Sequence, residues 1–141
     1  MPEPLHKDFK EFLESLIEKD VRFLVVGGYA VTWHGRPRNT EDIDIFIDRS
    51  EDNAKKITEA LENFGALEKG KTDSAIFTHH DRIFQMGLRP WKIDIFTHIP
   101  GVEFSACYEN RVFWEISELR IPMISLYHTD IGYDSIFNFN L

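Results

Sequence analysis

Two aspartates one residue apart are the first feature of this chain that could carry chemistry. Asp42 and Asp44 lie in the run DIDIFI, where they alternate with apolar residues. Such alternation is typical of a β-strand, in which side chains two residues apart share one face at about 6.5–7 Å. Mg²⁺ prefers oxygen ligands and often combines one or two carboxylates with phosphate oxygens and water. The pair therefore predicts a cation site suited to phosphoryl-group chemistry.

A third aspartate stands in a similar apolar setting. Asp94 lies in KIDIF, so Ile93 and Ile95 are expected to face a core while Asp94 faces the other side. If the two strands are neighbours, Asp42, Asp44 and Asp94 meet and can hold two cations, which together stabilise the attacking and leaving oxygens of a displacement. The alternative is that these acids only decorate a solvated strand surface. Aspartate is disfavoured in strands, however, and three of them in apolar runs favour a site.

A glycine pair precedes the first two acids. Gly27 and Gly28 end the apolar run RFLVV, and thirteen residues separate Gly28 from Asp42. Glycines at the end of a strand let the backbone approach phosphate oxygens, and a following helix directs its amides at them. Arg36 and Arg38, between the glycines and the acids, could neutralise phosphate charge. Ordinary turn glycines and solvated loop charges are the alternative interpretation of these four residues.

Other chemistry-bearing residues receive no role. His34 is interpreted as a helix-end or packing residue, and the neighbours His79 and His80 would point apart on a helix or strand. Cys107 is the single cysteine, so it can form neither an internal disulfide nor a thiolate metal site, which suits a reducing cytosol.

The elements that must position these residues follow from hydrophobic periodicity and turn residues. The spacing of apolar residues is helical before the first expected strand, and strand and helix patterns alternate after it. Residues 66–80 show no distinct pattern. We expect an α/β (α+β) fold with a mixed sheet, helices packed mainly on one face, and a single domain spanning residues 1–141. The expected elements are a helix at 5–19, strands at 22–26 and 42–47, helices at 29–34 and 51–64, strands at 82–88 and 91–98, and a hairpin of 112–116 with 119–124.

Composition limits the partners. The 141 residues are 43% hydrophobic and 13% aromatic, which is far from a disordered composition, and the formal net charge is −8. An acidic chain repels a long nucleic acid unless a local basic rim compensates, and the candidates for such a rim are Lys69, Lys71, Arg89 and Lys92. The N-terminal residues carry charges where a signal peptide needs an apolar core, and no window has membrane-spanning length. We therefore expect a cytoplasmic protein without a membrane partner.

The run FLVVGGYAVTWHGRPRNTEDIDIFID, residues 23–48, resembles the nucleotidyltransferase superfamily typified by DNA polymerase beta. It is most similar to small bacterial members related to abortive-infection toxins. These proteins have a third carboxylate in the site, and Asp94 in KIDIF matches it. A weaker likeness continues to about Ser125. The resemblance implies that Asp42 and Asp44 hold two Mg²⁺ ions, with Mn²⁺ as the alternative, and that Gly27 and Gly28 meet the phosphates of a nucleoside triphosphate. It also implies that Asp94 helps to activate an acceptor hydroxyl, so that a nucleoside monophosphate is transferred with release of pyrophosphate.

The C-terminal residues depart from that pattern. After ISL the chain continues YHTDIGYDSIFNFNL, without the helix and basic turn of similar proteins, and we expect that helix to be lost by truncation or a frame change. Two other functions stay open, a non-catalytic nucleotide-binding or interaction module and an adventitious cation site. The acceptor is also open between a small molecule, tRNA and a protein. The aromatic tail SIFNFNL could pack against a second copy in a homodimer.

Overall fold

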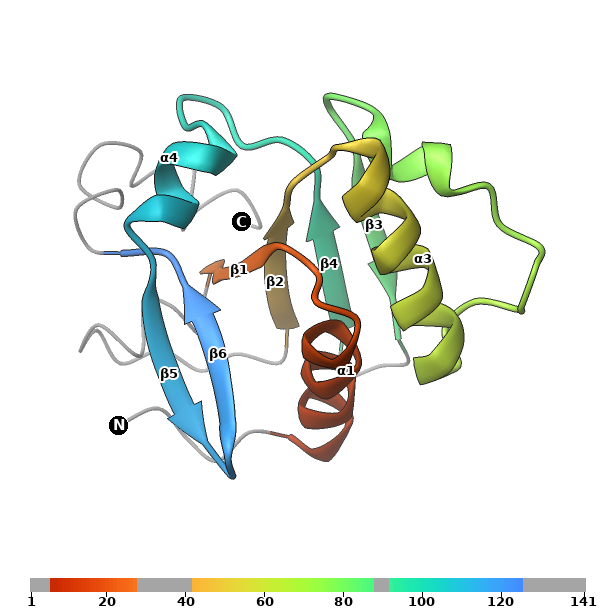
Figure 1. Ribbon diagram of the computed structural model, residues 1–141, viewed down its shortest axis with the longest axis horizontal. Helices are drawn as coiled ribbons and strands as arrows, with labels where there is room; N and C mark the ends of the chain where they lie inside the picture. The colour runs from red at the N-terminus through yellow and green to blue at the C-terminus, as the bar shows by residue number, and fades with distance from the viewer. Residues whose placement is uncertain (1–5, 28–41, 88–91, 126–141) are drawn as a thin grey trace.

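The computed structural model describes residues 6–27, 42–87 and 92–125, which form one six-stranded sheet with helices on both of its faces (Figure 1). The strand order is β3-β4-β2-β1-β6-β5, with β2 parallel to β4 and antiparallel to β1. The expected mixed sheet and α+β class are therefore confirmed. The strands are β1 (Phe23–Val26), β2 (Asp42–Ile47), β3 (Ile83–Met86), β4 (Lys92–Phe96), β5 (Val112–Ile116) and β6 (Leu119–Met123).

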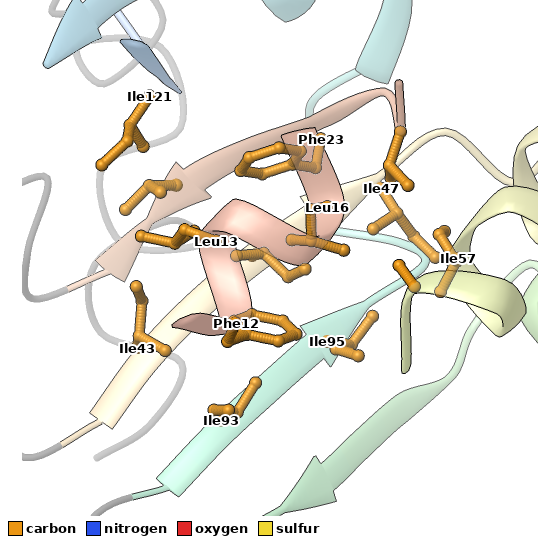
Figure 2. Close-up of a cluster of buried hydrophobic side chains, with 14 of the residues drawn as sticks. Phe12, Leu13, Leu16, Phe23, Ile43, Ile47, Ile57, Ile93, Ile95 and Ile121 are labelled. Atoms are coloured by element: carbon orange, nitrogen blue, oxygen red, sulfur yellow. The ribbon is translucent and has the colours of Figure 1, made fainter. Parts of the chain in front are cut away.

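Two amphipathic helices cover one face of the sheet. They are α1 (Lys7–Glu18) and α3 (Glu51–Phe64), and both agree with the expected helices to within two residues. Phe12, Leu13 and Leu16 of α1 pack toward the odd-numbered isoleucines of β2 and β4 (Figure 2). Ser50 accepts a hydrogen bond from the Asn53 amide at the start of α3, and Gly65 ends this helix in the left-handed conformation. The isoleucine side chains of β2 and β4 thus face these helices, which leaves the aspartates for the other face.

The second face carries a smaller apolar cluster under a short helix that the sequence pattern did not predict. This helix, α4 (Phe104–Glu109), places Cys107 against Phe46 and Phe96. Burial raises the pKa of the Cys107 thiol to about 11, so the sulfur remains a protonated core atom. A short 3₁₀ helix, η1 (Ser74–Thr78), lies within the segment that gave no distinct pattern. The expected helix at 29–34 and the connection through Arg89 lie outside the described residues.

Asn53 ties the start of β1 to the end of β2. Its Oδ1 accepts a hydrogen bond from the Arg22 amide at 2.7 Å, and its Nδ2 donates to the carbonyls of Arg22 and Asp48 at 3.1 and 2.6 Å. The residue is only 2% exposed, so water cannot replace these partners. This side chain therefore holds the two central strands in register at the end where both are anchored to α3.

We expect Asn53→Ala to lower the free energy of unfolding by about 3 kcal/mol, because three hydrogen bonds at about 1 kcal/mol each are lost. Urea unfolding followed by circular dichroism measures this change. Asn110→Ala is the matched control, since its side chain makes a single exposed hydrogen bond to the Ala106 carbonyl. Equal losses in the two variants would contradict the proposed role of Asn53.

Candidate active site

Asp44 and Asp94 lie side by side on the face opposite α1 and α3. The parallel pairing of β2 with β4 makes them direct cross-strand partners, and each is only 2% exposed. In the same register Asp42 pairs with Lys92, two residues closer to the start of both strands than the pair of Asp44 and Asp94. The alternation of both strands places all three acids on one face, because the intervening isoleucines are held in the core. The structure thus brings together the three acids that the sequence singled out.

Gly27 lies beside this row of three acids, Asp42, Asp44 and Asp94, on the side of β1. The antiparallel pairing of β1 with β2 sets Val26 opposite Asp44, so Gly27, which directly follows β1, lies against the Asp44 side chain. Gly27 has a φ of +70°, and a Cβ at this position would lie 2.1 Å from Asp44 Oδ2. Glycine is therefore required here both for its backbone conformation and for the space that the carboxylate occupies. Gly28, Arg36 and Arg38, the other predicted nucleotide-binding residues, lie outside the described residues.

The pKa of Asp94 reflects both its burial and its acidic neighbours. Burial is the largest influence on Asp94 and raises its pKa above 3.8, and the charge of Asp42 raises this pKa further. Hydrogen bonds with Asp44 and Gln85 and the charge of Lys92 act in the opposite direction. Two carboxyl groups can share a hydrogen bond only when one of them holds a proton, since an ionised carboxylate is an acceptor only. The row therefore brings three acidic side chains together, two of them buried.

The arrangement fits a hard divalent cation. Asp94 Oδ1 is buried without a hydrogen-bond partner, although such atoms are rarely left unpaired in folded proteins. Every donor offered by the three acids is an oxygen, as Mg²⁺ or Mn²⁺ prefers. Within the described segments, no group of three His, Cys, Asp or Glu side chains is placed so that it could hold a metal ion by itself. This also fits Mg²⁺, which commonly takes one or two carboxylates and completes its shell with water and substrate phosphates.

Comparison with known proteins identifies the family. The family model described as nucleotidyl transferase AbiEii toxin, type IV toxin–antitoxin system, matches residues 11–121. The chain belongs to the AbiEii nucleotidyltransferase family. No curated protein matches it significantly. The match spans both glycines, both central aspartates and Asp94, so the AbiEii assignment covers the whole candidate site.

The AbiEii-family fold has a counterpart of known structure. A crystal structure from Thermotoga maritima, described as a candidate nucleotidyltransferase, superposes with a TM-score of 0.61 at 19% identity. The match covers 89% of this chain and 80% of the other. At this identity the likeness supports the fold alone. None of the helices described for this AbiEii-family chain is both long enough and apolar enough to cross a bilayer.

Two polar neighbours of the acids differ in how well the sequence could reveal them. Gln85, the β3 partner of Asp94, was missed, since nothing in the sequence fixes which residue of β3 pairs with which residue of β4. Lys92 was expected only as part of a basic rim, and it lies beside Asp42. Lys69 and Lys71 belong to the segment that follows α3, and Arg89 lies outside the described residues. His80, which received no role from the sequence, lines a cavity away from the three acids.

Proposed function

We propose that this AbiEii-family chain is a Mg²⁺-dependent nucleotidyltransferase that moves a nucleoside monophosphate from a nucleoside triphosphate to a hydroxyl group. The observation that carries this proposal is the buried pairing of Asp44 with Asp94 beside Gly27. Asp42, Asp44 and Asp94 would hold Mg²⁺, with Mn²⁺ as the alternative, and the bound ions would neutralise charge on the α-phosphate and the leaving pyrophosphate. Two ions are expected, as in other in-line displacements at paired carboxylates.

The residues of the chain have separate tasks in the proposed reaction. Gly27 and Gly28 bring backbone amides to the phosphates, and Arg36 and Arg38 add positive charge there. The acceptor oxygen forms a bond to the α-phosphorus while the bond from that phosphorus to the pyrophosphate oxygen breaks. The Asp94 carboxylate takes the proton of the acceptor hydroxyl. Burial of Asp94 favours this task, because a raised pKa brings a carboxylate closer to the pH at which a base acts.

The remaining parts of the proposal concern partners and compartment. The substrate is a nucleoside triphosphate, and the acceptor is a small molecule, tRNA or a protein. We expect the protein to act in the cytoplasm, in a toxin–antitoxin context, and to form a homodimer if the aromatic tail is unpaired. The tail belongs to residues 126–141, which lie outside the described residues, as does the expected loss of the C-terminal helix.

A thermal-shift screen with the four nucleoside triphosphates, with and without Mg²⁺, tests this proposal together with an assay of pyrophosphate release. We expect one or more triphosphates to raise the melting temperature only when Mg²⁺ is present. Asp44→Asn should lower turnover at least about 10²-fold. The matched control is Asp52→Asn, an identical substitution at a side chain that is 82% exposed on α3.

The same measurements separate the alternatives. Mg²⁺-dependent binding without pyrophosphate release for any acceptor would identify a non-catalytic nucleotide-binding module. A melting temperature that responds to Mg²⁺ alone and to no triphosphate would leave only a cation site. Equal activity of Asp44→Asn and the parent chain would contradict the proposed reaction.

A further inference from the structure

A cavity opens at the end of the central strands that lies away from Asp42. It has a volume of about 670 Å³ and lies between the ends of β2 and β4, the start of α3 and the start of α4. Cavities of this size hold small ligands. Three residues separate Asp44 from Asp48, which lines the cavity just beyond the end of β2, so about 13 Å of extended chain lies between the two sites. Phe46 fills part of that interval and packs on Phe104 at a ring distance of 5.2 Å, so the cavity is distinct from the row of acids.

One part of the cavity wall carries nitrogen donors. Arg49, His80 and His98 all line it, and the two imidazole rings lie 6.0 Å apart. Arg49 Nη1 makes a long hydrogen bond, 3.4 Å, to the Thr78 carbonyl, and no carboxylate in the described segments pairs with it. His80 lies 3.7 Å from the exposed carboxylate of Asp81, a weak interaction in water. In a chain of net charge −8, this wall offers a guanidinium group that is available to an anion.

Another part of the cavity wall offers an acceptor and a half-buried aromatic ring. The Asp48 carboxylate is already engaged by Arg22 at 3.6 Å and by the Ser50 amide at 3.2 Å. Glu103 precedes α4, is exposed, and makes no capping hydrogen bond with that helix. It can therefore accept hydrogen bonds from a ligand. Phe104 follows it, with its ring stacked on Tyr108 at 5.3 Å and the Arg22 guanidinium 5.9 Å from the ring centre. Phe104 is half-buried and lines the cavity, so part of its ring stays open to a ligand.

We propose that this cavity binds a ribonucleoside monophosphate. Arg49 and the two histidines hold the phosphate, Glu103 accepts hydrogen bonds from the ribose hydroxyls, and the base lies against Phe104. A simple anion would use only the nitrogen donors, and a neutral sugar would leave Arg49 unused. The lining as a whole offers partners for a ligand that combines a phosphate, hydroxyl groups and an aromatic ring. The site is independent of the proposed transfer reaction, because it uses none of the residues assigned to it.

Isothermal titration calorimetry on the full chain tests this site. EDTA is present to remove divalent cations, so that the cation-dependent site of the proposed transfer reaction does not bind nucleotide. The probes are AMP, ribose 5-phosphate and inorganic phosphate. We expect AMP to bind more tightly than inorganic phosphate, and Arg49→Gln to weaken AMP binding about 10-fold or more. Arg82→Gln is the matched control, since Arg82 is an exposed neighbour of the cavity that does not line it. Asp44→Asn should bind AMP as the parent chain does.

Each outcome supports or overturns a stated part of the proposal. Absence of saturable AMP binding, or equal weakening by Arg49→Gln and Arg82→Gln, would overturn the site. Equal affinities for AMP and inorganic phosphate would overturn the assignment of Glu103 and Phe104 to the ribose and base. Loss of AMP binding in Asp44→Asn would show that the ligand occupies the row of acids instead. A chain that releases no pyrophosphate in any assay can still bind AMP here, so the two proposals fail separately.

Discussion

Gly27→Ala is expected to lower the free energy of unfolding by about 2–5 kcal/mol and to abolish nucleotidyl transfer. The left-handed backbone costs a residue with a side chain about 1–2 kcal/mol, and overpacking a filled site costs about 1–3 kcal/mol. The second cost arises because the added Cβ would lie 2.1 Å from Asp44 Oδ2. Urea unfolding measures the loss of stability, and pyrophosphate release measures the loss of transfer.

A second glycine provides the control for this experiment. Gly70 has a φ of +73°, nearly that of Gly27, yet a Cβ there would meet nothing within 4 Å. Gly70→Ala should therefore show only the backbone cost of about 1–2 kcal/mol. The double variant Gly27→Ala with Asp44→Ala should recover part of the loss, because the clashing carboxylate is gone. Equal destabilisation by Gly27→Ala and Gly70→Ala would contradict the close contact between Gly27 and Asp44.

Asp94→Asn should abolish transfer and yet stabilise the folded chain in metal-free buffer at pH 7. The substitution replaces a buried ionisable carboxyl group next to Asp42 and Asp44 with a neutral amide, which can still hydrogen bond with Asp44. Turnover should fall at least about 10²-fold, because a buried charged group at the reacting centre is lost. The melting temperature, measured with EDTA, should rise by a few degrees.

The stabilisation by Asp94→Asn should depend on pH. The pKa of Asp94 is raised above 3.8 by burial, so the folded parent chain binds a proton more tightly than the unfolded chain does. The stability that this proton contributes is fully present below pH 3.8 and is lost as pH rises through the folded-state pKa. The gain from Asp94→Asn should therefore appear above that range and vanish below pH 3.8. A melting temperature unchanged by the substitution at pH 7 would show that the buried charge of Asp94 does not destabilise the metal-free fold.

Much of the fold could be predicted because its elements have strong periodicity. Alternation in DIDIFI and KIDIF predicted both strands and the face on which Asp44 and Asp94 lie. Pairing could not be predicted in the same way, since the parallel register that joins Asp44 to Asp94 depends on contacts between distant segments. Helix α4 was missed because its six residues bury only Cys107, which leaves no apolar stripe. The glycine motif was found, but the close approach of Asp44 to Gly27 required coordinates.

The strand order has a consequence for how this protein opens. Because β2 has a hydrogen-bonded neighbour on each side, and β4 and β1 shield it from both edges, its amides should exchange with deuterium only through global unfolding. The edge strands β3 and β5 should exchange sooner. The paired acids are therefore attached to the part of the molecule that opens last, and local unfolding of the edge strands should leave the arrangement of Asp44 and Asp94 undisturbed.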